Sequence, residues 1–92
     1  MSVYQFEVLH QDKDSEARRG RAQTARGTYE TPAFMPVGTV GSVKGIPPWE
    51  LERTGAQVVL SNTYHLFLRP GHEVVGQLGG LHKMMDWPHS IL

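Results

Sequence analysis

Alternating apolar and polar side chains near the start of the chain predict an antiparallel ribbon. Residues 4–8 read Tyr-Gln-Phe-Glu-Val, so a half-buried strand is expected from about Val3 to Leu9. A polar turn follows at residues 12–15, and Arg26-Gly27 is typical of a hairpin turn before residues 28–31. Two or three antiparallel strands are therefore expected to come first.

Apolar runs and helix signals alternate after the ribbon. The run Ala33 to Val37 predicts a brief strand, because Pro36 cannot donate a ladder hydrogen bond and belongs near a strand end. Pro47-Pro48 suits the first turn of a helix that ends near Thr54. The continuous apolar run within Gln57 to Ser61 is typical of a strand buried on both faces.

A second helix and a third strand complete the pattern. Val74, Val75 and Leu78 fall on one helical face, and Ile91-Leu92 begins another apolar strand. Strand, helix, strand, helix, strand is the rhythm of βα units. The expected fold class is α/β, with an antiparallel ribbon over residues 1–31 and the first two βα units of a larger sheet over residues 32–92. The alternative is a small α+β domain that packs its ribbon on two short helices.

Composition and charge exclude several classes of protein and of binding partner. The 92 residues carry nine Lys and Arg against nine Asp and Glu, so no overall charge attracts nucleic acid or a membrane surface. There is no cysteine, which excludes disulfides, thiol nucleophiles and thiolate metal sites and fits a reducing compartment. No apolar run approaches the roughly 18 residues of a membrane span, so we expect a cytoplasmic chain without membrane contact.

The charged and histidine-rich segments give no strong site. His72-Glu73 begins like a zinc-protease motif, but position 76, where the second histidine would stand, is Gly76. We expect no metal site. Four arginines between residues 18 and 26 could contact phosphates, yet acidic residues at 12–16 partly cancel them and no aromatic residues interleave. A solvated strand face is the preferred interpretation.

The densest polar cluster, Ser61 to Leu66, follows the predicted buried strand. The C-terminal ends of parallel strands hold active sites in α/β folds. Asn62 could therefore donate to and accept from a polar ligand. The alternative is that its side chain satisfies the loop backbone.

Short motifs recur in a fixed order from about Phe6 to Leu92: Thr31-Pro-Ala-Phe-Met-Pro-Val-Gly-Thr39, Val43-Lys-Gly45, Gly55-Ala56, Asn62-Thr-Tyr-His-Leu66, Leu68-Arg-Pro-Gly71, and Gly79-Gly-Leu-His82 with Trp87. In order and spacing they closely resemble the tRNA-guanine transglycosylases, the queuine tRNA-ribosyltransferase family. The first and fourth motifs look like the queuine-type branch rather than the archaeal enzymes that modify the D-loop.

The resemblance implies a (β/α)8 TIM barrel preceded by an antiparallel ribbon, of which this chain would form the opening part. It also implies exchange of guanine at the tRNA wobble position for queuine, or for its 7-aminomethyl-7-deazaguanine precursor. In such enzymes a carboxylate attacks the ribose C1′ and displaces guanine, which gives a covalent ribosyl-enzyme. The incoming base then displaces the carboxylate from C1′. The partners implied are tRNA, a deazaguanine base and a second copy of the enzyme.

Position by position, the resemblance assigns supporting roles only. Val37, Leu60 and Asn62 would bind the flipped nucleotide, and Lys44 and Leu66 would lie near the homodimer contact. The acid/base aspartate would follow Leu92 in a Thr-Asp-Ser-Gly-Gly-Phe-Gln segment, and the nucleophilic aspartate lies further on. The structural zinc of the family uses three cysteines and a histidine near the C-terminus.

We therefore expect an N-terminal portion of the enzyme that is inactive alone and has no catalytic residue of its own. One alternative is a noncatalytic module that binds tRNA or complements a barrel through its open edge. Another is an independent small α+β binding protein.

Overall fold

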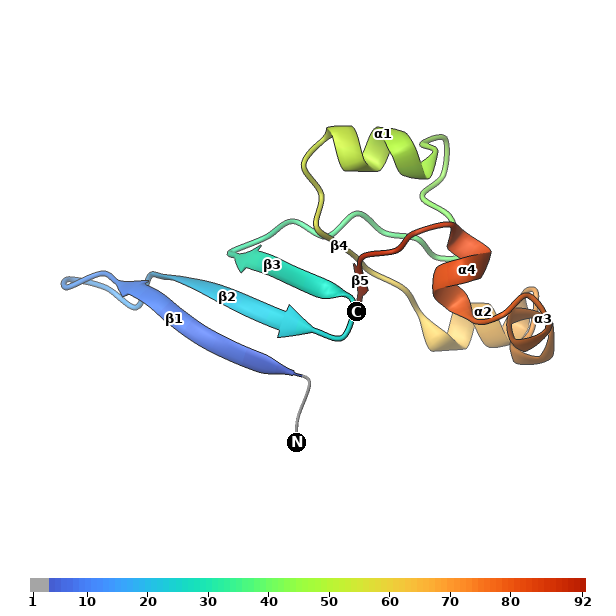
Figure 1. Ribbon diagram of the computed structural model, residues 1–92, viewed down its shortest axis with the longest axis horizontal. Helices are drawn as coiled ribbons and strands as arrows, with labels where there is room; N and C mark the ends of the chain where they lie inside the picture. Colours follow the sequence, from blue (N-terminus) through green and yellow to red (C-terminus); the bar gives the residue numbers. More distant parts are fainter. Residues whose placement is uncertain (1–3) are drawn as a thin grey trace.

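The computed structural model describes residues 4–92 and begins with a three-stranded antiparallel sheet (Figure 1). Strands β1 (Gln5–Gln11), β2 (Arg18–Thr24) and β3 (Gly27–Thr31) pair in the order β1-β2-β3. The predicted ribbon is confirmed, although its first strand lies about two residues further along than expected. Val3, the predicted start, lies outside the described residues.

The register gives the ribbon one apolar and one polar face. Phe6 pairs with Ala22, which pairs with Tyr29, and directly opposed residues point to the same side. The Phe6 ring also covers Gly20: a Cβ built there would lie 2.6 Å from the ring and 2.9 Å from the Thr31 hydroxyl. A side chain at position 20 would therefore displace the aromatic ring.

Short helices and parallel strand segments make up the rest of the chain. The helices are α1 (Pro48–Arg53), α2 (Thr63–Leu68), α3 (His72–Gln77) and α4 (Leu81–Met85), and the strands are β4 (Val58–Val59) and β5 (Ser90–Ile91). The fold is thus α/β, with an antiparallel sheet followed by helices and a parallel strand pair. Within residues 4–92, no helix is long and apolar enough to cross a membrane.

Three neighbouring segments run parallel in chain order. Val37 forms a parallel bridge with Leu60, and β4 pairs in parallel with β5. The Leu60 amide donates to the Pro36 carbonyl at 2.8 Å. The expected strand over residues 33–37 is shorter than predicted, because only its end pairs. Pro36 takes part through its carbonyl alone, since it has no N–H.

The core lies between the parallel segments and the helices. Leu51, Val59, Met85 and Trp87 form its buried cluster, and the Trp87 side chain is 1% exposed. The Trp87 indole Nε1 donates to the Ser90 carbonyl at 3.0 Å, which satisfies its polar atom inside the core. One aromatic side chain therefore joins α1, β4, α4 and the start of β5.

The ribbon is attached at the N-terminal ends of the parallel strands. The Thr24 and Ser90 hydroxyl oxygens lie 2.7 Å apart, and Ser90 is the first residue of β5. The Glu30 amide donates to Gln57 Oε1 at 2.8 Å, and Gln57 immediately precedes β4. Figure 1 shows β3 beside this pair and β1 on the far side of the ribbon. The opposite, C-terminal edge of the parallel strands is not covered by the ribbon.

Two of the four helices within residues 4–92 were not predicted from the sequence. Helix α2 begins after Asn62, an effective N-cap residue, in a segment interpreted as a polar loop. Helix α4 follows Gly80 and ends at Met85, and the next residue, Asp86, caps it with a left-handed φ of 55°. The predicted helix near Pro47-Pro48 is confirmed as α1, and the one around Val74 as α3.

Candidate functional site

The candidate site is the C-terminal edge of the parallel segments. The bridge places Val37 beside Leu60, and the Gly38 amide donates to the Leu60 carbonyl at 2.7 Å. The Val37 side chain is 51% exposed, so this edge is open to a ligand. The structure therefore brings together two of the three residues expected to bind substrate.

Asn62 follows two residues after Leu60 and has a structural role. Its side-chain oxygen Oδ1 accepts from the amides of Tyr64 at 3.0 Å and His65 at 3.3 Å, which caps α2. The interpretation of Asn62 as a residue that satisfies local backbone is therefore confirmed for its oxygen. Its side-chain amide has no hydrogen-bond partner within residues 4–92 and remains available as a donor.

Gly38, which the sequence analysis did not select, shapes this edge. A Cβ at this position would lie 2.8 Å from the terminal methyl group of Met85 and 3.6 Å from the Leu60 carbonyl. A side chain at position 38 would therefore require the end of the Met85 side chain to move, while the backbone of Leu60 lies at ordinary contact distance. The sequence feature that could have indicated this close packing is a glycine directly after a predicted strand.

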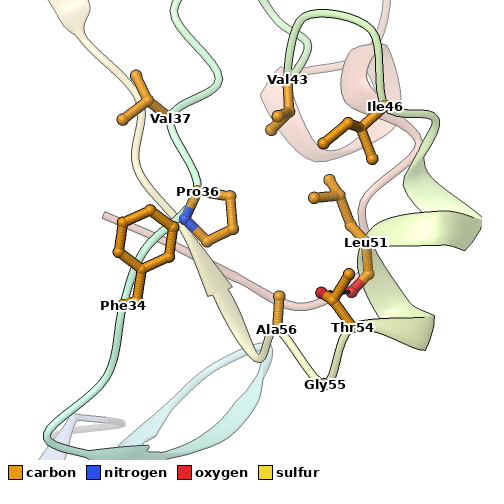
Figure 2. A pocket seen from close by; sticks show the side chains of 9 residues that line it. All are labelled: Phe34, Pro36, Val37, Val43, Ile46, Leu51, Thr54, Gly55 and Ala56. Atoms are coloured by element: carbon orange, nitrogen blue, oxygen red, sulfur yellow. Dashed lines mark hydrogen bonds between the residues drawn. The ribbon is translucent and has the colours of Figure 1, made fainter.

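An apolar hollow of about 630 Å³ adjoins this edge, between residues 34–37 and α1 (Figure 2). It is lined by Phe34, Pro36, Val37, Val43, Ile46, Leu51, Thr54, Gly55 and Ala56. The ring of Pro36 points into this space, whereas the side chain of Val37 points away from α1. Because no lining residue is charged, the hollow offers packing surface rather than chemistry.

The two residues expected near a dimer contact differ in accessibility. Lys44 is exposed in the loop before α1 and makes no ion pair within the part of the chain that is described. Leu66, in contrast, is only 9% exposed and packs within the chain. Lys44 thus offers a partner a charged side chain, while Leu66 offers little surface.

The residues of this chain do not fit the zinc that the resemblance implies. Within residues 4–92, no group of three or more His, Cys, Asp or Glu side chains could hold a metal ion. The sequence also lacks the cysteines that such a site would use. No chemistry of this chain is therefore assigned to a metal.

The pKa of His82 is shifted, and this side chain lies away from the candidate site. Burial lowers the pKa of His82, and the charge of Arg26 lowers it further, against a backbone hydrogen bond with His89 that raises it. Arg26 belongs to the hairpin turn of the ribbon. The segments that form the candidate edge, residues 36–38, 60–62 and 91–92, contain no Asp or Glu. They contribute apolar, hydroxyl and amide side chains.

A family model and several individual proteins match this chain, and all of them carry the same description. A model of the family described as queuine tRNA-ribosyltransferase matches residues 12–92. The queuine tRNA-ribosyltransferase of Dictyoglomus turgidum is 56% identical over 87 residues, and that of Syntrophobacter fumaroxidans is 58% identical over 87 residues. Both alignments cover 95% of this chain. The protein of the same name from Halalkalibacterium halodurans is 52% identical over all 92 residues.

The shared region is a small part of these relatives. This chain spans 22% of the Dictyoglomus protein, 23% of the Syntrophobacter protein and 24% of the Halalkalibacterium protein. Identity above one half over nearly the whole chain, together with the family match, establishes the relationship. The chain belongs to the queuine tRNA-ribosyltransferase family.

Proposed function

We propose that this chain forms the N-terminal part of a tRNA-guanine transglycosylase and supplies one wall of its nucleotide pocket. The reaction exchanges guanine at the anticodon wobble position for queuine or for 7-aminomethyl-7-deazaguanine. The observation that carries this proposal is the pairing of Val37 with Leu60 at the open C-terminal edge, with Asn62 directly beyond. Ligands bind at this edge in parallel α/β sheets and barrels.

Each residue at the edge has a role that fits a nucleotide removed from its stack. Val37 and Leu60 provide apolar surface for the ribose and base, while Asn62 donates from its side-chain amide to an acceptor oxygen. Because Asn62 Oδ1 is already occupied by the α2 cap, the amide orientation is fixed before the ligand binds. Such preorganisation reduces the entropic cost of binding a flipped base.

The carboxylates of the reaction belong to further strands of a (β/α)8 barrel. Residues 1–31 form the ribbon unit of this architecture, and residues 32–92 contribute its first βα units. The parallel order of the segments at residues 37, 60 and 91 supports this arrangement. Without those further strands, the chain alone does not catalyse base exchange.

The complete enzyme is proposed to act in the cytoplasm as a homo-oligomer. Lys44 and the α2 segment that contains Leu66 lie near the contact between the two copies. The Lys44 side chain is exposed and makes no ion pair within residues 4–92, which supports this placement, since a lysine of this kind can pair with a carboxylate on another copy. The structural zinc is held by residues outside this chain.

The test uses this chain joined after Leu92 to the part of the Dictyoglomus relative that lies beyond the matched region. The joined protein should incorporate radiolabelled guanine into tRNA, whereas the 92-residue chain should not. Asn62→Asp keeps an oxygen to cap α2 but removes the amide donor, so incorporation should fall roughly tenfold or more. Asn62→Gln is not a suitable control, because its longer side chain displaces both groups.

Two results would contradict the proposal. Guanine incorporation by the chain alone would show that the reactive groups are already present. Full activity of the joined protein carrying Asn62→Asp, with an unchanged melting temperature, would limit Asn62 to its capping role.

A further inference from the structure

A second hollow, of about 340 Å³, lies between the hairpin turn of the ribbon and helix α4. This basic hollow is lined by Arg26, Gly79, His82, Lys83, Asp86, Trp87 and Pro88. We propose that it binds a small, freely diffusing oxyanion of the phosphate class, held by the guanidinium of Arg26 and the ammonium of Lys83. The site is independent of the proposed function, because none of its residues belongs to the candidate edge.

Two cations and one carboxylate line the basic hollow, so its net charge is positive. Arg26, Lys83 and Asp86 are exposed, and none of the three forms an ion pair within residues 4–92. Both cations are therefore available to an incoming anion. A guanidinium binds a phosphate group through two parallel hydrogen bonds, and an ammonium adds a compact positive charge.

Local contacts restrain the segments that carry the two cations. The Arg26 amide donates to the Thr24 hydroxyl oxygen at 3.1 Å, and that oxygen lies 2.7 Å from the Ser90 hydroxyl oxygen. On α4, the aliphatic stem of Lys83 lies over Gly79, where a built Cβ would be 2.7 Å from the Lys83 Cδ. The turn backbone and the lysine stem are thus ordered before a ligand binds, which lowers the entropic cost of binding.

His82 shows that positive charge is felt at the basic hollow. Burial lowers the pKa of His82, and the charge of Arg26 lowers it further. The His82 Nε2 atom is buried and has no hydrogen-bond partner within the described part of the chain. A phosphate group bound beside Arg26 would offset the guanidinium charge and raise the pKa of His82 without contacting Nε2.

The location of the basic hollow selects a free anion rather than the phosphate backbone of tRNA. Trp87 and Pro88 precede β5, and Thr24, just before the ribbon turn, contacts Ser90 at the start of β5. The basic hollow therefore lies at the N-terminal end of β5, on the side opposite the candidate edge. The phosphates beside a nucleotide bound at the candidate edge would lie on the other side of the parallel strands.

Calorimetric titration with inorganic phosphate at constant ionic strength tests the proposal, in the 92-residue chain and in the joined protein described above. Lys83→Met keeps the stem over Gly79 but removes the charge, so the dissociation constant for phosphate should rise at least about tenfold. Lys13→Met, in the exposed turn at the other end of the ribbon, is the matched control and should leave that constant unchanged.

Asp86→Asn gives the opposite expectation. It removes the carboxylate that opposes the anion, and asparagine suits the left-handed backbone at this position. Phosphate should therefore bind about threefold to tenfold more tightly. NMR of the His82 ring protons gives a second readout, since saturating phosphate should raise the pKa of His82, and Lys83→Met should reduce this rise at the same phosphate concentration.

Three results would overturn the proposal. Equal weakening by Lys83→Met and Lys13→Met would mean that the cations act only through a diffuse ion atmosphere. Binding to the 92-residue chain but not to the joined protein would show that the rest of the enzyme covers the basic hollow. Displacement of phosphate by excess tRNA would identify nucleic acid as the occupant. None of these measurements uses guanine exchange, so failure of this site and failure of the proposed function are distinguishable.

Discussion

The ribbon and the parallel part of this chain are held together by different kinds of contact. In the ribbon, each strand pairs with its neighbour along the chain, so β1, β2 and β3 form a sheet through backbone hydrogen bonds between nearby residues. In the parallel part, Val37, Leu60 and Ile91 become neighbours only through connections that contain helices. The ribbon leaves Phe6 and Val8 exposed, whereas the parallel part buries Val58, Val59 and Trp87.

The difference shows which interactions support each region. Local pairing can form without a large core, but parallel pairing depends on the packing that holds the crossovers in place. Removal of a core side chain should therefore disrupt the parallel part more than the ribbon. A substitution that disturbs the close packing of the ribbon backbone should instead disrupt the ribbon more than the parallel part.

The largest expected effect is that of Trp87→Ala. This change opens a cavity among Leu51, Val59 and Met85 and leaves the Ser90 carbonyl without its indole donor. The free energy of unfolding should fall by about 3–5 kcal/mol. Hydrogen exchange should show loss of protection at Val59 and Leu60 before the amides of β2. Equal loss in both regions would mean that the ribbon has no independent order.

The next effect concerns Gly20, where the ribbon backbone meets the Phe6 ring. Gly20→Ala places a methyl group against that ring and the Thr31 hydroxyl, so the free energy of unfolding should fall by about 1–3 kcal/mol. Gly76→Ala is the matched control, because apart from the two neighbouring residues and the backbone of α3 itself, no atom lies within 4 Å of the new methyl group. There helix propensity should raise stability by about 1 kcal/mol. Urea unfolding of both variants measures the contrast, and a stabilising Gly20→Ala would contradict the packing of Phe6.

A smaller effect is expected at the cap of α2. Asn62→Ala removes the oxygen that accepts from Tyr64 and His65 and should cost about 1 kcal/mol. Asn62→Asp restores an acceptor at the start of the helix and should recover the wild-type melting temperature. Equal melting temperatures for wild type and Asn62→Ala would show that the cap contributes nothing to stability.

The smallest effect is a pH dependence that links the two regions. The pKa of His82 is lowered by burial and then by Arg26 of the ribbon turn. The unfolded chain therefore binds a proton more readily than the folded chain, so stability should decrease as the pH falls below about 6.5 toward the folded pKa. His82→Gln should make the urea midpoint of unfolding depend less on pH in this range. The same change at the exposed His10 serves as control, and an equal flattening there would contradict the assignment to His82.

The sequence predicted the ribbon and α1 because their signals are local. Alternation through residues 4–8, the Arg26-Gly27 turn and the prolines before α1 each act on neighbouring residues. Helix α2 was missed because its polar residues were interpreted as a loop, although it is as long as α1 and α3. Helix α4 has five residues, too few to show a helical period. For α2, the cap residue Asn62 was the signal that could have revealed it.

The sequence selected residues for the candidate edge but did not predict the contacts that those residues make. Its position after a buried strand pointed to Asn62, and the motifs pointed to Val37 and Leu60. The sequence left open whether Asn62 serves a ligand or the backbone. The structure commits its oxygen to α2 and leaves only its amide for a ligand. The contact between Gly38 and Met85 was not predicted, because the two residues lie far apart in the sequence.

By itself, the sequence determined the strand and turn order of the ribbon, the first helix and the family to which the chain belongs. These follow from interactions between residues close in the chain and from motifs that are read in order. Only the tertiary structure decided that Thr24 meets Ser90, that Glu30 meets Gln57 and that the ribbon therefore lies opposite the candidate edge. These contacts join residues 27 or more positions apart, and their formation depends on how the whole backbone packs.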